Sequence, residues 1–111
     1  MRALDELRAF QIEGEPDVVQ DIVKAYLQEA KVKIDELQRA FEDKDYDTLQ
    51  RNAHSLKSSS GNLGLSRLAS FTMELDALCK ENQAADGAEL VDMIIAEFIN
   101  VEKELDKVIS K

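Results

Sequence analysis

The chain has 111 residues, of which 44% are apolar, and a formal net charge of −9 at pH 7. This length and apolar content suit one packed domain, which we place at residues 1–111, rather than a disordered tail. The acidic charge argues against nucleic-acid binding, which depends on clustered lysines and arginines, and the single cysteine, Cys79, leaves no internal disulfide possible.

Apolar residues at helical spacing predict two helices in the first third of the chain. A short helix is expected over about residues 4–10, ending before Gly14 and Pro16, because proline suits a first helical position. The second helix keeps the i, i+3, i+4 rhythm over several turns. Its predicted buried face consists of Val19, Ile22, Val23, Tyr26, Leu27, Ala30, Ile34, Leu37 and Phe41. Residues 43–45 are predicted to form a turn, with Asp45 as the N-cap of the next helix.

Three more helices are predicted after this turn. The third would bury Leu49, Ala53, Leu56, Ser60 and Leu63 and end around residues 61–64. The fourth would bury Leu68, Phe71, Leu75, Leu78 and Cys79, and residues 84–87 would form the next turn. The last helix would bury Leu90, Val91, Ile94, Ile95, Phe98, Val101, Leu105 and Val108. No segment alternates with a period of two, so the sequence predicts an all-α fold: an up-and-down antiparallel four-helix bundle with a short extra N-terminal helix.

The single histidine, His54, falls on an unusual face of the predicted third helix. At ~100° per residue from the centre of the apolar stripe, Lys57 lies near ~80°, Gly61 near ~120°, His54 near ~140° and Ser58 near ~180°. His54 is therefore predicted to point outward, with Lys57 and Ser58 one turn along on its own side. Exposed helix faces usually carry Glu, Lys and Gln rather than small residues. Small residues around one imidazole and one ammonium favour partner docking and phosphoryl chemistry.

Residues 53–64, AHSLKSSSGNLG, followed by Leu68 and Glu74-Leu75, resemble the histidine-containing phosphotransfer (HPt) domain family. That family has the pattern His-x-x-Lys-Gly-small-small, then three varied residues and a glycine, within a four-helix bundle. His54, Lys57 and Gly64 fall at the matching positions, and the resemblance covers nearly the whole chain. One position departs from the pattern: Ser58 stands where the family usually has glycine, which bears on how closely a partner approaches.

The resemblance implies a chemistry for this face. His54 would accept a phosphoryl group on its outer ring nitrogen, Nε2, from the phosphoaspartate of a response-regulator receiver domain, and pass it to another receiver. Lys57 would neutralise part of the phosphoryl charge. A receiver would dock an apolar patch beside its aspartate onto the surface around His54. We expect this docking surface to include Arg51, Ser58, Gly61, Gly64, Leu65 and Arg67.

The resemblance also implies partners and cofactors. The chain would be a phosphoryl carrier rather than an enzyme, with no kinase or ATP site and no metal or cofactor of its own, because Mg²⁺ would be bound by the receiver. A sensor histidine kinase would act upstream. No apolar stretch approaches the ~20 residues that span a bilayer, and the N-terminus lacks the apolar core of a signal peptide. We therefore expect a cytoplasmic monomer that binds no membrane and no nucleic acid.

Several other interpretations compete with this one. The phospho-accepting domain of a chemotaxis-type histidine kinase has a similar fold and histidine motif, and stays open. A histidine-kinase dimerisation helix is disfavoured, because Ser55 follows His54 where an acid is typical and no proline follows Pro16. A di-iron bundle needs paired Glu-x-x-His motifs, whereas Arg51 stands three residues before the one histidine. A helical adaptor with an idle histidine is the last alternative, because a lone histidine is often an ordinary surface residue.

Overall fold

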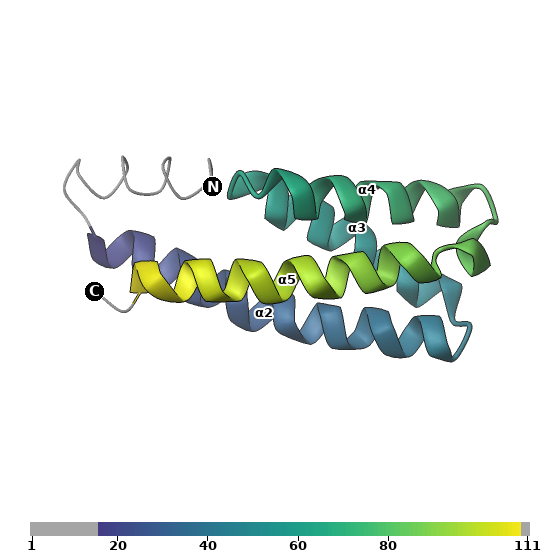
Figure 1. Cartoon of the computed structure of the whole chain (residues 1–111), viewed down its shortest axis with the longest axis horizontal. Coiled ribbons are helices and arrows are strands. Elements are labelled where there is room, and N and C mark those ends of the chain that lie inside the picture. The colour runs from purple at the N-terminus through teal and green to yellow at the C-terminus, as the bar shows by residue number, and fades with distance from the viewer. Residues whose placement is uncertain (1–15, 110–111) are drawn as a thin grey trace.

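The computed structural model describes residues 16–109, and the part described is an all-helical bundle. Its long helices are α2 (Pro16–Glu42), α3 (Tyr46–Asn62), α4 (Ser66–Lys80) and α5 (Ala88–Ile109), with the one-turn 3₁₀ helix η1 (Ala84–Asp86) before α5. Successive helices run in opposite directions, and each packs against two neighbours (Figure 1). The predicted up-and-down four-helix bundle is confirmed, whereas the helix expected over residues 4–10 lies outside the described residues. None of the described helices is long and apolar enough to cross a membrane.

The core lies along the bundle axis and follows the apolar stripes of the four helices. Its largest fully buried side chains are Val19, Val23, Leu37, Leu49, Leu56, Leu68, Leu75, Ile94, Val101 and Leu105. The prediction that Ile22 lies on the buried face of α2 is wrong, because this residue is 45% exposed. Ile22 is ~100° around the helix from Val23, at the edge of the stripe that faces the core. The predicted turn over residues 84–87 contains η1, in which Ala84 is buried.

Hydrogen bonds to backbone groups fix both ends of α3. At its start the Asp45 side chain accepts a hydrogen bond from the Thr48 backbone N–H at 3.3 Å, which confirms the predicted N-cap. At its end the Gly64 N–H donates to the Gly61 carbonyl at 3.0 Å, and the Leu65 N–H donates to the Ser60 carbonyl at 2.9 Å. Gly64 has φ 72°, a left-handed conformation that favours glycine. These features define a Schellman motif, so Gly64 has a backbone role in ending the helix.

The same motif explains a wrong prediction for Leu65. The residue that follows the left-handed position of a Schellman motif commonly packs its apolar side chain back against the helix. Leu65 occupies that position and is only 2% exposed, within the core cluster. Its side chain is therefore unavailable to a docking partner, contrary to the expectation from the sequence.

A hydrogen-bonded polar pair joins α2 to α3 inside the core. The hydroxyls of Tyr26 and Ser60 lie 3.0 Å apart, and Ser60 is fully buried. Burial raises the pKa of Tyr26 to about 12, although the hydrogen bond with Ser60 opposes the rise. The small Ser60 side chain leaves the phenol ring space between the helices.

We expect Ser60→Ala to lower the free energy of unfolding by about 1–3 kcal/mol, because it leaves the Tyr26 hydroxyl buried without its partner. Urea denaturation measures this loss. Tyr26→Phe is the matched control and should cost less than Ser60→Ala, because the Ser60 hydroxyl is then free to bond a carbonyl of its own helix. A Ser60→Ala protein as stable as wild type would contradict the role of this pair.

Candidate functional site

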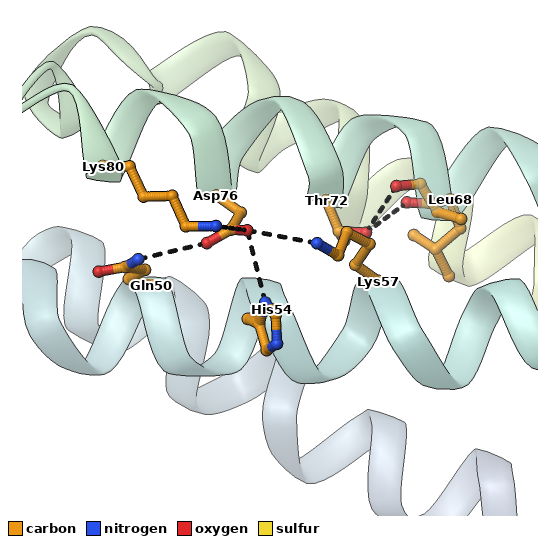
Figure 2. A network of polar contacts seen from close by, with 8 residues as sticks. Gln50, His54, Lys57, Leu68, Thr72, Asp76 and Lys80 are labelled. Carbon is orange, nitrogen blue, oxygen red and sulfur yellow. Dashed lines mark hydrogen bonds and ion pairs between the residues drawn. The ribbon is translucent and has the colours of Figure 1, made fainter.

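His54 lies on the side of α3 that faces α4, at the surface of the bundle. Its side chain is 58% exposed, and its Nδ1 lies 3.5 Å from Oδ2 of Asp76 on α4. The Asp76 side chain is only 3% exposed. Figure 2 shows that Nδ1 points toward Asp76, whereas Nε2 points away from it. One ring nitrogen is thus held by the protein, and the other is open to an incoming group.

Asp76 is the centre of a polar network that connects α3 and α4 (Figure 2). Besides His54, its Oδ2 lies 3.5 Å from Nζ of Lys57 and 3.2 Å from Nζ of Lys80. Its Oδ1 accepts a hydrogen bond from the Gln50 side-chain amide at 3.4 Å. Burial by itself raises the pKa of Asp76, but hydrogen bonds from Lys80, His54 and Gln50 outweigh it and hold the pKa below its usual value. Asp76 is therefore an ionised carboxylate at neutral pH.

This carboxylate determines which nitrogen of a neutral His54 imidazole carries the proton. A carboxylate only accepts hydrogen bonds, so Nδ1 must be the protonated nitrogen that donates to it. Nε2 then keeps a free lone pair and faces solvent, which is the state a nucleophilic imidazole requires. Lys57 lies one turn along the same helix, with its ammonium 3.5 Å from Oδ2 of Asp76, and its long side chain allows this charge to reach a group bound at Nε2. The arrangement suits attack by Nε2 on an electrophilic, negatively charged group.

Three predicted site residues lie where the sequence placed them. Ser58 and Gly61 are exposed on the His54 side of α3, and Arg51 is exposed one turn before His54. Gly61 follows His54 by two turns, so the two residues are separated by only ~20° around the helix. A Cβ added at Gly61 would meet no atom within 4 Å. Nothing inside the protein therefore requires glycine at this exposed helical position.

Arg67 does not belong to the His54 face, contrary to the expectation from the sequence. It precedes Asp76 by nine residues, which is two and a half helical turns, so the two side chains leave α4 on opposite sides. Arg67 lies instead beside α5, where its Nε is 3.9 Å from Oε1 of Glu97. Its guanidinium also lies over the ring of Phe71, 5.8 Å from the ring centroid.

Sequence reasoning missed three members of the network: Asp76, Gln50 and Lys80. The spacing gives only an indirect signal for Asp76, which lies ~100° around α4 from Leu75, at the border of the apolar stripe. Acidic side chains are almost never buried unless they are paired. The burial of Asp76 at that border therefore requires partners on a neighbouring helix.

Comparison with known proteins gives a family and a related structure. The family model described as Hpt domain matches residues 21–111 of the chain. The fold is similar to the crystal structure of histidine-containing phosphotransfer protein B (HptB) from Pseudomonas aeruginosa PAO1, with a TM-score of 0.82 and 23% sequence identity. That alignment covers 91% of this chain and 87% of the other. No curated protein matches the chain.

Proposed function

This chain belongs to the Hpt domain family, and we propose that His54 is its residue that carries the phosphoryl group. Members of this family transfer phosphoryl groups through a histidine in phosphorelays. The observation that supports this choice is the 3.5 Å contact between Nδ1 of His54 and the buried Asp76 carboxylate, which leaves Nε2 free and exposed. Hpt domains are carriers rather than kinases, and they interact with receiver domains and kinases.

The proposed transfer needs no proton to leave the histidine. The lone pair of Nε2 attacks the phosphorus of a phosphoaspartate on a receiver domain. A P–N bond forms, and the P–O bond to the receiver's aspartate breaks, with its electron pair remaining on that aspartate as a carboxylate. Nδ1 keeps its proton, so the ring gains a positive charge that the Asp76 carboxylate stabilises. Lys57 neutralises part of the charge on the phosphoryl oxygens. The reverse steps pass the group to another receiver.

The remaining components of the reaction are assigned to the partners. We propose that the receiver domain binds the Mg²⁺, that a sensor histidine kinase acts upstream, and that this chain has no ATP site. We further propose that it works as a monomer in the cytoplasm.

The surface around His54 supports receiver docking, although its residues are not all those that the sequence predicts. Met73 on α4 is 53% exposed. Met73 precedes Asp76 by three residues, which places it ~60° around α4 from Asp76 and farther from the core, on the side that faces α3. Together with Arg51, Ser58 and Gly61 it forms what we call the docking face. An exposed apolar side chain beside small residues fits the apolar patch expected next to a receiver's aspartate.

The experiment that tests the function is phosphotransfer from a phosphorylated receiver domain. We expect the chain to take up label that is lost in acid and stable in base, as a phosphohistidine is, and peptide mapping should place it on His54. Incubation with ATP alone should give no label. Label from ATP alone would show that the chain has kinase activity of its own, and label on another residue would overturn the assignment of His54.

Gly61→Gln should separate docking from stability. We expect the free energy of unfolding to rise by roughly 0.5–1 kcal/mol, because glutamine has the higher helix propensity and its Cβ meets open space. Transfer from a phosphorylated receiver should slow roughly tenfold, because the longer side chain obstructs the approach to His54. Labelling by phosphoramidate, a small donor that needs no docking, is the control and should change less than twofold. Unchanged transfer from the receiver would remove Gly61 from the docking face.

A further inference from the structure

Two lysines from different helices lie on one oxygen of Asp76. Nζ of Lys80 is 3.2 Å from Oδ2, and Nζ of Lys57 is 3.5 Å from the same atom. In Figure 2 the two ammonium groups approach the carboxylate from opposite directions along α3, Lys80 beside Gln50 and Lys57 beyond His54. Nδ1 of His54 also lies 3.5 Å from this oxygen. Asp76 therefore has two cations before any phosphoryl group is present.

The two lysines differ in what they can reach. Lys57 follows His54 by one turn of α3, so its ammonium can move to a phosphoryl group on Nε2 while its backbone stays in place. Lys80 follows Asp76 by four residues on α4, so its side chain lies along its own helix against that carboxylate. A phosphoryl group on His54 and the Asp76 carboxylate would compete for Lys57. If Lys57 moved and Lys80 were absent, the buried Asp76 carboxylate would lose both ammonium groups and keep only the positive charge that forms on the His54 ring, and loss of partners from a buried charge is destabilising.

We propose that Lys80 is a positioning residue that keeps the Asp76 carboxylate compensated when Lys57 leaves it for the phosphoryl group. This inference rests on the proposed function of His54. With Lys80 in place, Lys57 is free to neutralise the incoming charge, and Asp76 continues to hold Nδ1. Without Lys80, Asp76 retains Lys57, and the phosphoryl group meets an imidazole with no cation beside it. Lys80 thus acts through Asp76, without touching the phosphoryl group.

A double-mutant cycle between Lys80 and Asp76 tests this inference. The measured quantity is the rate at which phosphoramidate labels His54, because this donor excludes any effect of the exposed Lys80 on docking. We expect Lys80→Gln to slow labelling roughly tenfold in the wild-type background and less than twofold in the Asp76→Asn background. If Lys80→Gln still slows labelling roughly tenfold in the Asp76→Asn background, Lys80 contacts the phosphoryl group directly. If Lys80→Gln does not slow labelling in the wild-type background, Asp76 needs no second lysine when Lys57 moves to the phosphoryl group. Either result overturns the proposal.

Controls separate this inference from a change in net charge and from the proposed function itself. Lys80→Arg keeps a cation within reach of Asp76 and should restore the rate to within about threefold of wild type. Lys24→Gln removes an exposed lysine on α2 and should leave the rate unchanged. The ring ¹⁵N chemical shifts of His54 should still show the proton on Nδ1 in unlabelled Lys80→Gln, because Lys57 then compensates Asp76; a proton found mainly on Nε2 would contradict the proposal. Label that persists in His54→Gln would overturn the proposed function, whatever Lys80 does.

Discussion

Replacing His54 with glutamine is expected to abolish phosphoryl uptake from a phosphorylated receiver and to leave the bundle folded. The amide nitrogen of glutamine has no available lone pair, so the P–N bond has no nucleophile. The amide can still donate a hydrogen bond toward Asp76, and the position is largely exposed. We therefore expect the free energy of unfolding to stay within about 0.5 kcal/mol of wild type. Acid-labile label measures the transfer, and urea denaturation measures the stability.

Ser58→Gly is the matched control for this experiment, because it changes a neighbour of His54 on the same face and leaves the imidazole intact. It restores the glycine that the Hpt family usually has at this position and should retain labelling. Complete loss of label in Ser58→Gly would make Ser58 a required contact of the phosphoryl group. Retained label in His54→Gln would mean that another residue carries it.

The helices and the face of His54 could be predicted because both depend on local spacing. A periodicity near 3.6 residues places Leu49, Ala53 and Leu56 on one side of α3 whatever the rest of the chain does. The same spacing turns His54 and Lys57 toward the boundary of that side. The end of α3 was also readable from the sequence, since an apolar residue after Gly64 is typical of a Schellman motif. Leu65 is buried because it follows Gly64 in this turn, and helical spacing alone does not predict its position.

The network around Asp76 could not be predicted in the same way. Which residue of α4 lies opposite His54 depends on the axial offset of α4 relative to α3, and the turn between them sets that offset. A shift of one helical turn, about 5.4 Å, would place Thr72 or Lys80 beside the imidazole instead. The sequence could indicate that Asp76 needs a partner, but only the packing of the two helices shows that His54 is one of its partners.

Asp76→Asn should slow transfer from a phosphorylated receiver by about a hundredfold, although Asp76 is buried beside the reacting residue and touches no phosphoryl group. Asparagine keeps the shape of the side chain and removes its negative charge. The ring of His54 becomes positive as the P–N bond forms, so the transition state loses its charge partner. A neutral amide also no longer forces the proton onto Nδ1, so Nε2 is less often the free nitrogen. Ring ¹⁵N chemical shifts of His54 should show this change of tautomer.

The same substitution should lower the free energy of unfolding at pH 7 by about 2–3 kcal/mol, because Asp76 accepts charge-assisted hydrogen bonds. The pKa of Asp76 is lower in the folded chain than its ordinary value of 3.8, so ionised Asp76 stabilises the fold above that pH. This contribution disappears as the pH falls through the lowered pKa. The difference in stability between wild type and Asp76→Asn should therefore narrow below pH 3.8.

Glu74→Gln is the matched control for Asp76→Asn, because it removes one negative charge from an exposed position on the other side of α4. It should change neither the transfer rate nor the pH dependence of stability. A destabilised Asp76→Asn protein that transfers at the wild-type rate would show that the carboxylate only joins α3 to α4. Slow transfer together with the shifted ¹⁵N resonances of His54 would show that the buried charge sets the nucleophile, because packing alone does not select the protonated nitrogen of an imidazole.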